Sequence, residues 1–354
     1  MKKVYINSIA SISAQKTFDN SEFLNEFIDH DAQVINVVNP NYKDYIPPAA
    51  ARRMAKGIKM GVVASKIALQ ESGLENVDAI ITGTGMGCVR DSEKFVSAII
   101  DNDEQYLTPT SFIQSTHNTV GGQIALDLQC KGYNFTYVHA SNSFESAVLD
   151  AKLQLELNEE NNILIGGVDE LGDHTVTIHK LINHIKPEAV KVSELLDSKT
   201  EGAVFGEGAN FFVLSNEKKA TSYAQVLAIK LFNTLSQNDV SQAAIQFLED
   251  NNMTAEDIDM VVLGNNGDVH YDSYYQALGS GIFKNTQQVY YKHLCGEFNT
   301  ASAFGFWLAS KILKTQMLPE VVKINDLDIS NYKTILLYNQ YRGENHSFTL
   351  LKSC

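Results

Sequence analysis

The stretch 74-LENVDAIITGTG-85 decides the fold, because a stretch of the same design, 255-AEDIDMVVLGNN-266, follows it at an offset of 181 residues. Each stretch comes after a segment with helical periodicity and carries an aspartate, a short apolar run and a glycine. Asp78 matches Asp259 at this offset, and the glycines that end the apolar runs match as well. Self-similarity at a fixed offset indicates repeated structural units. The sequence therefore predicts two equivalent halves.

Short apolar runs alternate with amphipathic patterns along most of the chain, which is typical of α/β proteins with a largely buried sheet. The predicted strands are residues 1–14, 77–85, 134–140, 161–169, 208–214, 258–266 and 333–340, and the predicted helices are residues 51–73, 143–158, 240–252 and 300–315. We place the boundary between the halves near residue 220, giving 1–220 and 221–354. No Pro/Ser-rich linker separates them, so we expect the halves to share one body.

The composition excludes some classes of function. The chain has 42 acidic and 28 basic residues and a formal net charge of -14, which disfavours a nucleic-acid partner because phosphate binding needs a basic surface. No run of 18 apolar residues occurs, so we expect no membrane-spanning helix. The N-terminal segment resembles a signal peptide only faintly and is interpreted as the first strand.

The cysteines indicate a reducing compartment. Cys88, Cys130, Cys295 and Cys354 are scattered, and no C-x-x-C pair occurs. This spacing predicts neither a zinc site nor a redox motif. Low cysteine usage in a chain of this length suits the cytosol. We therefore expect a cytoplasmic protein with no metal and no cofactor.

Six motifs, in this order, resemble those of the β-ketoacyl synthases, the condensing enzymes of fatty acid and polyketide synthesis. They are AARRMAKGIKMG (50–61), TGTGMG (82–87), LTPTSFIQSTHNTVGGQIAL (107–126), IGGVDE (165–170), EGAVFGEGANFFVL (201–214) and YYKHLCGEFNTASAFG (290–305). The resemblance covers about residues 1–350. It implies a thiolase-like α/β fold with two βαβαβαββ halves in a five-layer αβαβα arrangement, which agrees with the internal repeat.

The resemblance also implies positions for the catalytic residues of the family, which are a cysteine, two histidines and a lysine. The cysteine position falls on Ser141, in the segment 137-YVHASNSFESAVLDA-151. The first histidine opens an H-G-T segment in the family, and its position falls on Asn265, or on Gly264 if the gap lies elsewhere. Lys292 matches the lysine, and Glu297 takes the second histidine position. The cysteine and both histidines are thus replaced, and the lysine is kept.

These replacements predict a degenerate site. Ser141 is interpreted either as a helix cap or as an acyl acceptor, and a serine hydroxyl needs a base for the second role. Glu297 as a carboxylate would repel both a malonyl carboxylate and the enolate formed from it. We expect Lys292 to form an ion pair with Glu297, with Glu145 and Asp268 as further candidate partners.

Nearby side chains do not supply the missing chemistry. His139, His270 and Cys295 lie close to the family positions in sequence but outside the matched register. A C-terminal loop that gates the pocket in the family corresponds here to 338-YNQYRGENHSF-348, which we interpret as a shortened loop.

The resemblance implies a non-condensing partner subunit, the chain-length-factor type of aryl polyene, flexirubin or type II polyketide systems. Such a subunit shapes the acyl tunnel of a heterodimer. The implied partners are an active ketosynthase subunit, or a second copy in a homodimer, and an acyl carrier protein. Residues 107–126 and 134–140 are expected in the interface. The alternative is an acyltransferase or hydrolase that uses Ser141, and a third interpretation is an ordinary homodimeric synthase whose nucleophile lies elsewhere.

Overall fold

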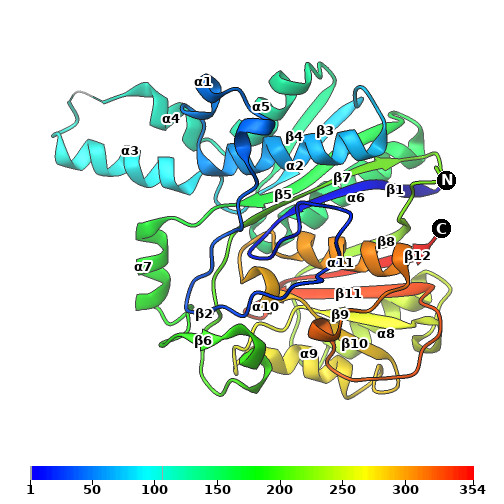
Figure 1. Cartoon of the computed structure of the whole chain (residues 1–354). Coiled ribbons are helices and arrows are strands. Elements are labelled where there is room, and N and C mark those ends of the chain that lie inside the picture. The colour runs from blue at the N-terminus through cyan, green and yellow to red at the C-terminus, as the bar shows by residue number, and fades with distance from the viewer. Residues whose placement is uncertain (1, 106) are drawn as a thin grey trace.

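Twelve strands and eleven α-helices make up the computed structural model, which describes residues 2–105 and 107–354 (Figure 1). The strands are β1 (Val4–Ile12), β2 (Asp31–Ala32), β3 (Ala79–Gly83), β4 (Tyr133–Tyr137), β5 (Asn162–Asp169), β6 (Val190–Lys191), β7 (Gly208–Ser215), β8 (Ala224–Thr234), β9 (Met260–Leu263), β10 (Gln287–Tyr290), β11 (Thr334–Tyr341) and β12 (Glu344–Ser353). The helices are α1 (Pro48–Ala51), α2 (Lys56–Ser72), α3 (Val89–Asp101), α4 (Pro109–Ser115), α5 (Thr119–Leu128), α6 (Ser143–Leu157), α7 (Asp173–Leu181), α8 (Val240–Asp250), α9 (Asp272–Gly279), α10 (Lys292–Cys295) and α11 (Ser302–Thr315).

The order of the strands is the same in both halves when each is followed outward from the β1–β8 pair. Ten strands are hydrogen-bonded in the order β10-β9-β11-β12-β8-β1-β7-β5-β3-β4. In the first half β3 lies parallel between β5 and β4, and in the second half β9 lies parallel between β11 and β10. The halves meet where β1 pairs antiparallel with β8. A boundary near residue 220 would fall between β7 and β8, and it stays a prediction.

The matched aspartates of the repeat make matched hydrogen bonds. Asp78 accepts the backbone N–H groups of Asn161 and Asn162 at 3.1 and 2.9 Å, where β5 begins. Asp259 accepts those of Lys333 and Thr334, both at 2.8 Å, where β11 begins. Each aspartate thus ties the start of one parallel strand to the start of its neighbour. The internal repeat predicted from the sequence is a structural repeat.

The elements form the predicted five layers (Figure 1). Helices α2 and α5 cover the outer face of the first-half strands, and α8 and α9 cover that of the second-half strands. Helices α6 and α11 lie between the two sets of strands, in an apolar core that contains Phe144, Phe306 and Trp307. Within the described residues, no helix has both the length and the apolar character needed to cross a membrane.

Most predicted elements are confirmed, with two differences. The helix predicted over residues 51–73 is interrupted, because α1 ends at Ala51 and α2 begins at Lys56. Residues 338–348 do not form a loop. They belong to the antiparallel strands β11 and β12, joined at Arg342 and Gly343 with φ of 53° and 78°. Two residues of positive φ make the tight turn that suits the twist of a hairpin, and glycine favours it.

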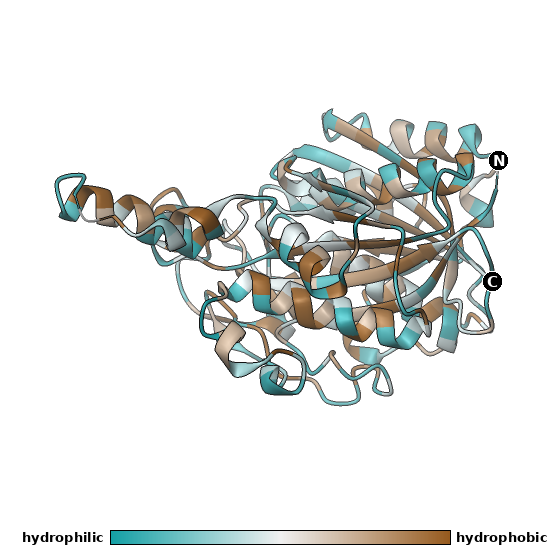
Figure 2. Ribbon diagram, turned by 90° about the horizontal axis from the view of Figure 1, so that it is seen from above, coloured by the Kyte–Doolittle hydropathy of each residue, from teal (hydrophilic) through white to brown (hydrophobic). Residues whose placement is uncertain are grey.

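Two surfaces of the first half expose apolar side chains. Helices α3 and α4 project from the body as an arm (Figures 1 and 2). Phe95 and Phe112 pack together in this arm with ring centroids 5.2 Å apart, while Ile100 and Ile113 are exposed. Strand β4 is the outermost strand at one edge of the sheet, and it also carries exposed aromatic side chains.

Candidate functional site

Ser141 lies in a 3-10 turn, Ala140–Asn142, directly before α6. Its side chain is buried, and its Oγ has no hydrogen-bond partner among the described residues. The N-cap position belongs to Asn142, and the local hydrogen bonds are made by Ser143. Ser143 Oγ accepts the His139 N–H at 2.8 Å and donates to the Ala140 carbonyl at 2.6 Å. Ser141 is therefore packed closely under the turn, as predicted, but it is not the helix cap.

Lys292 and Glu297 form a buried ion pair. Lys292 begins α10, and its Nζ lies 2.7 Å from Glu297 Oε2, with 1% and 2% of the two side chains exposed. The predicted pairing is confirmed. The other two candidate partners bind elsewhere: Asp268 pairs with Arg342 at 3.0 Å, and Glu145 accepts a hydrogen bond from the hydroxyl of Ser347 at 2.9 Å.

The backbone of Glu297 is fixed by the glycine-rich segment before β7. Its N–H donates to the Val204 carbonyl at 2.8 Å, and its carbonyl accepts the Gly206 N–H at 3.0 Å. A Cβ on Gly206 would lie 2.0 Å from the Cys295 carbonyl oxygen, so only glycine allows this approach. Gly206 therefore allows the close approach of these two backbone segments.

Asn266, rather than Asn265, contacts the ion pair. Asn266 Nδ2 donates to Glu297 Oε2 at 2.6 Å, the same oxygen that Lys292 binds. Asn265 lines a separate cavity beside α9. The signal for this one-residue difference was Gly267, which has a φ of 79° and follows Asn266 as a glycine follows the first histidine in the family segment.

Asp272 holds the backbone of this segment from the first turn of α9. Its two carboxylate oxygens accept the N–H groups of Asn266 and Gly267, both at 3.0 Å. Burial raises the pKa of Asp272 to about 6, against the lowering effect of these hydrogen bonds and of the Lys292 charge. Sequence reasoning missed Asp272.

Glu145 is a further buried carboxylate, on the first turn of α6. Burial raises its pKa, opposed by the hydrogen bond from Ser347 and by the charge of Lys292. It lines a very small cavity together with Tyr291 and Asn339, and the Tyr291 hydroxyl donates to Asn339 Oδ1 at 3.2 Å. The start of α6 and the Lys292 region therefore interact electrostatically.

Asp169, within the IGGVDE motif, joins the two halves next to the site. Its Oδ1 accepts the Thr84 hydroxyl and the Gly85 N–H, both at 2.9 Å. Its Oδ2 accepts the N–H and hydroxyl of Thr300, just before α11, at 2.9 and 2.8 Å. This carboxylate thus fixes the end of β3 against the second half.

The structure brings the predicted residues together only in part. Lys292 and Glu297 are in direct contact, and Glu297 also lines a cavity of about 50 Å³ with His179, Phe205 and other residues. The turn that contains Ser141 packs against β12. Within residues 2–105 and 107–354, Ser141 makes no hydrogen bond to Lys292 or Glu297.

The nearby histidines and cysteine do not contact Ser141 through hydrogen bonds in the described part of the chain. His139 is exposed and lies 3.5 Å from Ser146 Oγ, and His270 is exposed and lies 3.8 Å from Glu201. Cys295 is buried, and burial raises the pKa of its thiol well above the usual value. No group of three or more metal-ligating side chains is positioned to hold a metal ion among the described residues.

Comparison with known proteins gives a consistent family. Residues 12–220 match the family model described as "Beta-ketoacyl synthase, N-terminal domain". A 3-oxoacyl-[acyl-carrier-protein] synthase 2 of Vibrio cholerae is 23% identical over 200 residues, which cover 52% of this chain and 48% of the relative. One of Rhizobium meliloti is 24% identical over 248 residues, covering 62% and 58%. The chain spans about half the length of the curated relatives it matches.

Solved structures match along the whole chain at low identity. A β-ketoacyl synthase from Burkholderia phymatum has a TM-score of 0.82 at 16% identity and covers 100% of both chains. The ishigamide ketosynthase/chain length factor has a TM-score of 0.79 at 18% identity, covering 100% of this chain and 99% of that one. A ketosynthase in complex with its chain length factor from Xenorhabdus doucetiae has a TM-score of 0.77 at 16% identity, covering 100% and 98%. These similarities show the thiolase-like fold.

Proposed function

The chain belongs to the β-ketoacyl synthase family, and on this premise we propose that it is a non-condensing partner subunit of the chain-length-factor type. In this role it binds an active ketosynthase and shapes the acyl tunnel in fatty acid, polyketide or aryl polyene biosynthesis. The observation that carries the proposal is the buried Lys292–Glu297 ion pair, which occupies the positions matched to the family's lysine and second histidine.

The ion pair opposes condensation on chemical grounds. Decarboxylation of a malonyl group leaves enolate charge, which hydrogen-bond donors must stabilise. Lys292 and Asn266 both donate to the same carboxylate oxygen of Glu297, so these donors are directed at a protein carboxylate. Losing one such donor costs about 10²–10³ in rate. The cavity beside Glu297, about 50 Å³, also leaves little room for a substrate.

The exposed edge of β4 supports a partner chain. Tyr133 and Phe135 are 40% and 44% exposed on this edge, with which no further strand of the described residues pairs, and Val138 follows them at the surface. An exposed edge strand with apolar side chains is a template for pairing with another chain. An interface that continues the sheet through β4 and covers residues 107–126 would fall in the obligate class, roughly 2,000 Å² or more.

Assembly with an active subunit explains why a degenerate site is retained. The partner supplies the cysteine and histidines, and this chain supplies the second wall of the tunnel and the dimer contact. An acyl carrier protein then delivers substrate to the active partner. Several solved structures of similar fold are ketosynthase and chain length factor complexes, and one holds an acyl-carrier protein with its ketosynthase, which supports this arrangement.

The experiment is reconstitution with a cysteine-bearing ketosynthase from the same organism. We expect co-expression to yield a heterodimer, and acyl and malonyl carrier proteins to give β-ketoacyl product only when both subunits are present. The matched control replaces the partner's nucleophilic cysteine by alanine and should abolish product without affecting assembly. Product formed by this chain alone would overturn the proposal.

A second candidate function is acyl transfer or hydrolysis through Ser141. The observation that favours it is the buried Ser141 hydroxyl, which no described residue binds. Incubation with an acyl donor and mass spectrometry of the intact protein would show an adduct, absent from the Ser141→Ala variant. No adduct with a carrier-bound or coenzyme A-bound acyl group would reject this candidate and leave the subunit proposal standing.

A further inference from the structure

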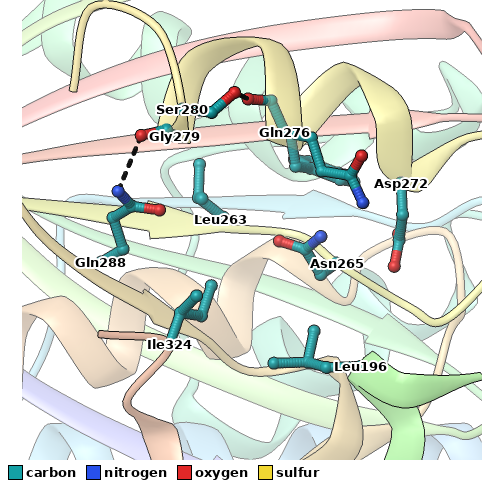
Figure 3. A pocket seen from close by; sticks show the side chains of 10 residues that line it. Leu196, Leu263, Asn265, Asp272, Gln276, Gly279, Ser280, Gln288 and Ile324 are labelled. Atoms are coloured by element: carbon teal, nitrogen blue, oxygen red, sulfur yellow. Dashed lines mark hydrogen bonds between the residues drawn. The ribbon is translucent and has the colours of Figure 1, made fainter. Parts of the chain in front are cut away.

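We infer that a cavity beside α9 is a binding site for a small organic cation, a primary ammonium compound with a short apolar chain. The cavity has a volume of about 400 Å³ (Figure 3). One face of α9 and its C-terminal end, the end of β9 and the start of β10 surround it, together with two side chains from nearby loops. Its lining includes the apolar side chains of Leu196, Leu263 and Ile324 and the polar side chains of Asn265, Asp272 and Gln288.

Asn265 supplies an unused hydrogen-bond acceptor. The residue is 6% exposed, and its Oδ1 has no partner among the residues that the structure describes. Its amide nitrogen points toward Asp272 (Figure 3). In Figure 3 the oxygen points the other way, into the cavity between Leu263 and Ile324. A buried carbonyl oxygen without a partner is costly, which indicates that a donor belongs there.

Gln288 supplies a second acceptor. Its Nε2 donates to the carbonyls of Gly279 and Phe283 at 2.8 and 3.1 Å, so both amide hydrogens are used. These bonds fix the orientation of the amide and leave Oε1 on the cavity side, as Figure 3 shows. A side chain held in place by other hydrogen bonds presents its free atom with little loss of conformational entropy.

Asp272 is the acidic group of the cavity wall, and no basic side chain is present among the lining residues. Each carboxylate oxygen accepts one backbone N–H group and keeps capacity for another donor. The nearest buried ammonium groups bind other atoms: Lys292 is paired with Glu297, and Lys186 donates to the Gly267 carbonyl at 2.6 Å. The cavity therefore has acceptors and a negative charge without a protein cation to match them.

The shape and chemistry select a primary ammonium group. Such a group has three donors and no acceptor, which matches Asn265 Oδ1, Gln288 Oε1 and the Asp272 carboxylate. Leu196, Leu263 and Ile324 provide an apolar wall for a short alkyl chain. A carboxylate or phosphate would meet acceptors and a like charge, and a neutral alcohol brings only one donor. The net charge of -14 also attracts cations over anions at long range.

This inference is independent of the proposed subunit role. None of its contacts involves Ser141, Lys292 or Glu297. The one-residue shift that gives Asn266 the contact with Glu297 is what leaves the Asn265 side chain for the cavity.

The test is titration of the full chain with n-butylammonium chloride, with n-butanol and sodium butyrate as isosteric neutral and anionic probes. Isothermal titration calorimetry or ligand-observed NMR measures the affinity. We expect saturable one-to-one binding of butylammonium at least about tenfold tighter than either control, since charge-assisted hydrogen bonds are the stronger ones. Equal affinities for the three probes, preference for butyrate, or no saturable butylammonium binding would overturn the inference.

Three variants locate the binding. Asp272→Asn should weaken butylammonium binding about tenfold, again because it removes the charge assistance. Leu196→Trp should abolish binding by filling the cavity from its partly exposed wall; its side chain makes no hydrogen bond, so this variant decides the question even if Asp272→Asn does not fold. Glu256→Gln changes the net charge equally at an exposed site outside the cavity and should leave the affinity unchanged. Binding that persists in Leu196→Trp, or falls equally in Glu256→Gln, would contradict the assignment.

Discussion

The turn after β4 and the turn after β10 hold corresponding places in the two halves, but their polar groups are satisfied in opposite ways. After β4 comes Ser141, buried with a hydroxyl that no described residue binds. After β10 comes Lys292, whose ammonium group is paired with Glu297 and shares that carboxylate with the Asn266 amide. The hydroxyl in the first turn thus has no partner among the described residues, whereas the ammonium group in the second turn is paired within the same chain.

The outer edges of β4 and β10 also differ in whether the chain itself covers them. The edge of β4 exposes Tyr133 and Phe135, and no strand pairs with it within the described chain. The edge of β10 is covered by the segment after α11: the Ile324 N–H donates to the Gln288 carbonyl at 2.9 Å, and Asn325 Oδ1 accepts the Gln288 N–H at 2.7 Å. A repeated fold thus need not repeat its surroundings. One outer strand is covered by another segment of the same chain, and the other has no strand beside it within the described chain.

Breaking the Lys292–Glu297 ion pair should have the largest effect on stability. Lys292→Met leaves the Glu297 carboxylate buried with only an amide donor, and removing one partner of a buried ion pair costs about 3–5 kcal/mol in the free energy of unfolding. Urea denaturation followed by circular dichroism measures this loss. The double variant Lys292→Met/Glu297→Leu should recover most of it, because no buried charge remains. A single variant as stable as the parent would show that the pair does not hold this turn.

A charge on the exposed edge of β4 should have the next largest effect. We expect it to weaken assembly rather than folding. Phe135→Glu places a charge in the centre of the expected interface and should weaken subunit association by about 2–4 kcal/mol, the range for a central aromatic contact. Size-exclusion chromatography with light scattering measures the molar mass over a dilution series. Met317→Glu makes the same kind of change at another exposed apolar side chain and should leave assembly intact. Unchanged assembly in both variants would remove β4 from the interface.

A pH titration would sharpen the comparison at the ends of β3 and β9. Asp169 accepts the N–H of Gly85 in the first half, and Asp272 accepts that of the matching residue, Asn266, in the second. Burial raises the pKa of Asp272 from 3.8 to about 6. A carboxyl whose pKa is raised by folding binds its proton more tightly in the folded state. Its contribution to stability therefore falls as the pH rises from about 4 to 6.

The difference in unfolding free energy between the parent protein and Asp272→Asn should change accordingly. We expect the parent to lose about 2–3 kcal/mol relative to the variant between pH 4 and pH 6, at about 1.4 kcal/mol per pKa unit. Above pH 6 the difference should level off. Guanidinium denaturation at several pH values measures it, and parallel curves for the two proteins would show that Asp272 does not titrate in this range.

Removing a hydrogen bond that covers the edge of β10 should have the smallest effect on stability. Asn325→Ala removes the acceptor of the Gln288 N–H and the donor to the Thr286 carbonyl, and should cost about 1–2 kcal/mol of stability. Hydrogen exchange at the Gln288 amide should accelerate at the same time. Asp328→Ala, at an exposed position in the same segment, provides the control. Equal effects of the two changes would mean that the segment does not protect β10.

The internal similarity in the sequence predicted the repeat. The resemblance to the β-ketoacyl synthases implied the five layers and the positions of Lys292 and Glu297, and their opposite charges predicted the ion pair. The pair was predictable because two opposite charges lie on either side of a glycine turn, and neither can be buried alone at low cost. Asp78 and Asp259 were visible because they precede apolar runs of the same length.

The remaining features depend on contacts between distant segments. The choice of Asn266 over Asn265 depends on the positive φ of Gly267 and on Asp272, which holds this backbone from the next helix. Strand β8 is only partly buried and alternates weakly, so its pattern did not indicate a strand. The hairpin at Arg342 was taken for a loop because its strands are defined by pairing with β8 and β9.

The layer formed by α6 and α11 cannot be completed until late in synthesis on the ribosome. Helix α6 can form once residue 157 has emerged, but the apolar face that carries Phe144 packs against Phe306 of α11, with ring centroids 5.5 Å apart. At about 5–20 residues per second, the roughly 150 residues between these helices take on the order of 10–30 s to translate. During that interval the nascent first half carries an uncovered apolar surface on α6 as well as the open edge of β4. Chaperone binding to nascent chains should therefore peak before α11 emerges and decline once it has docked.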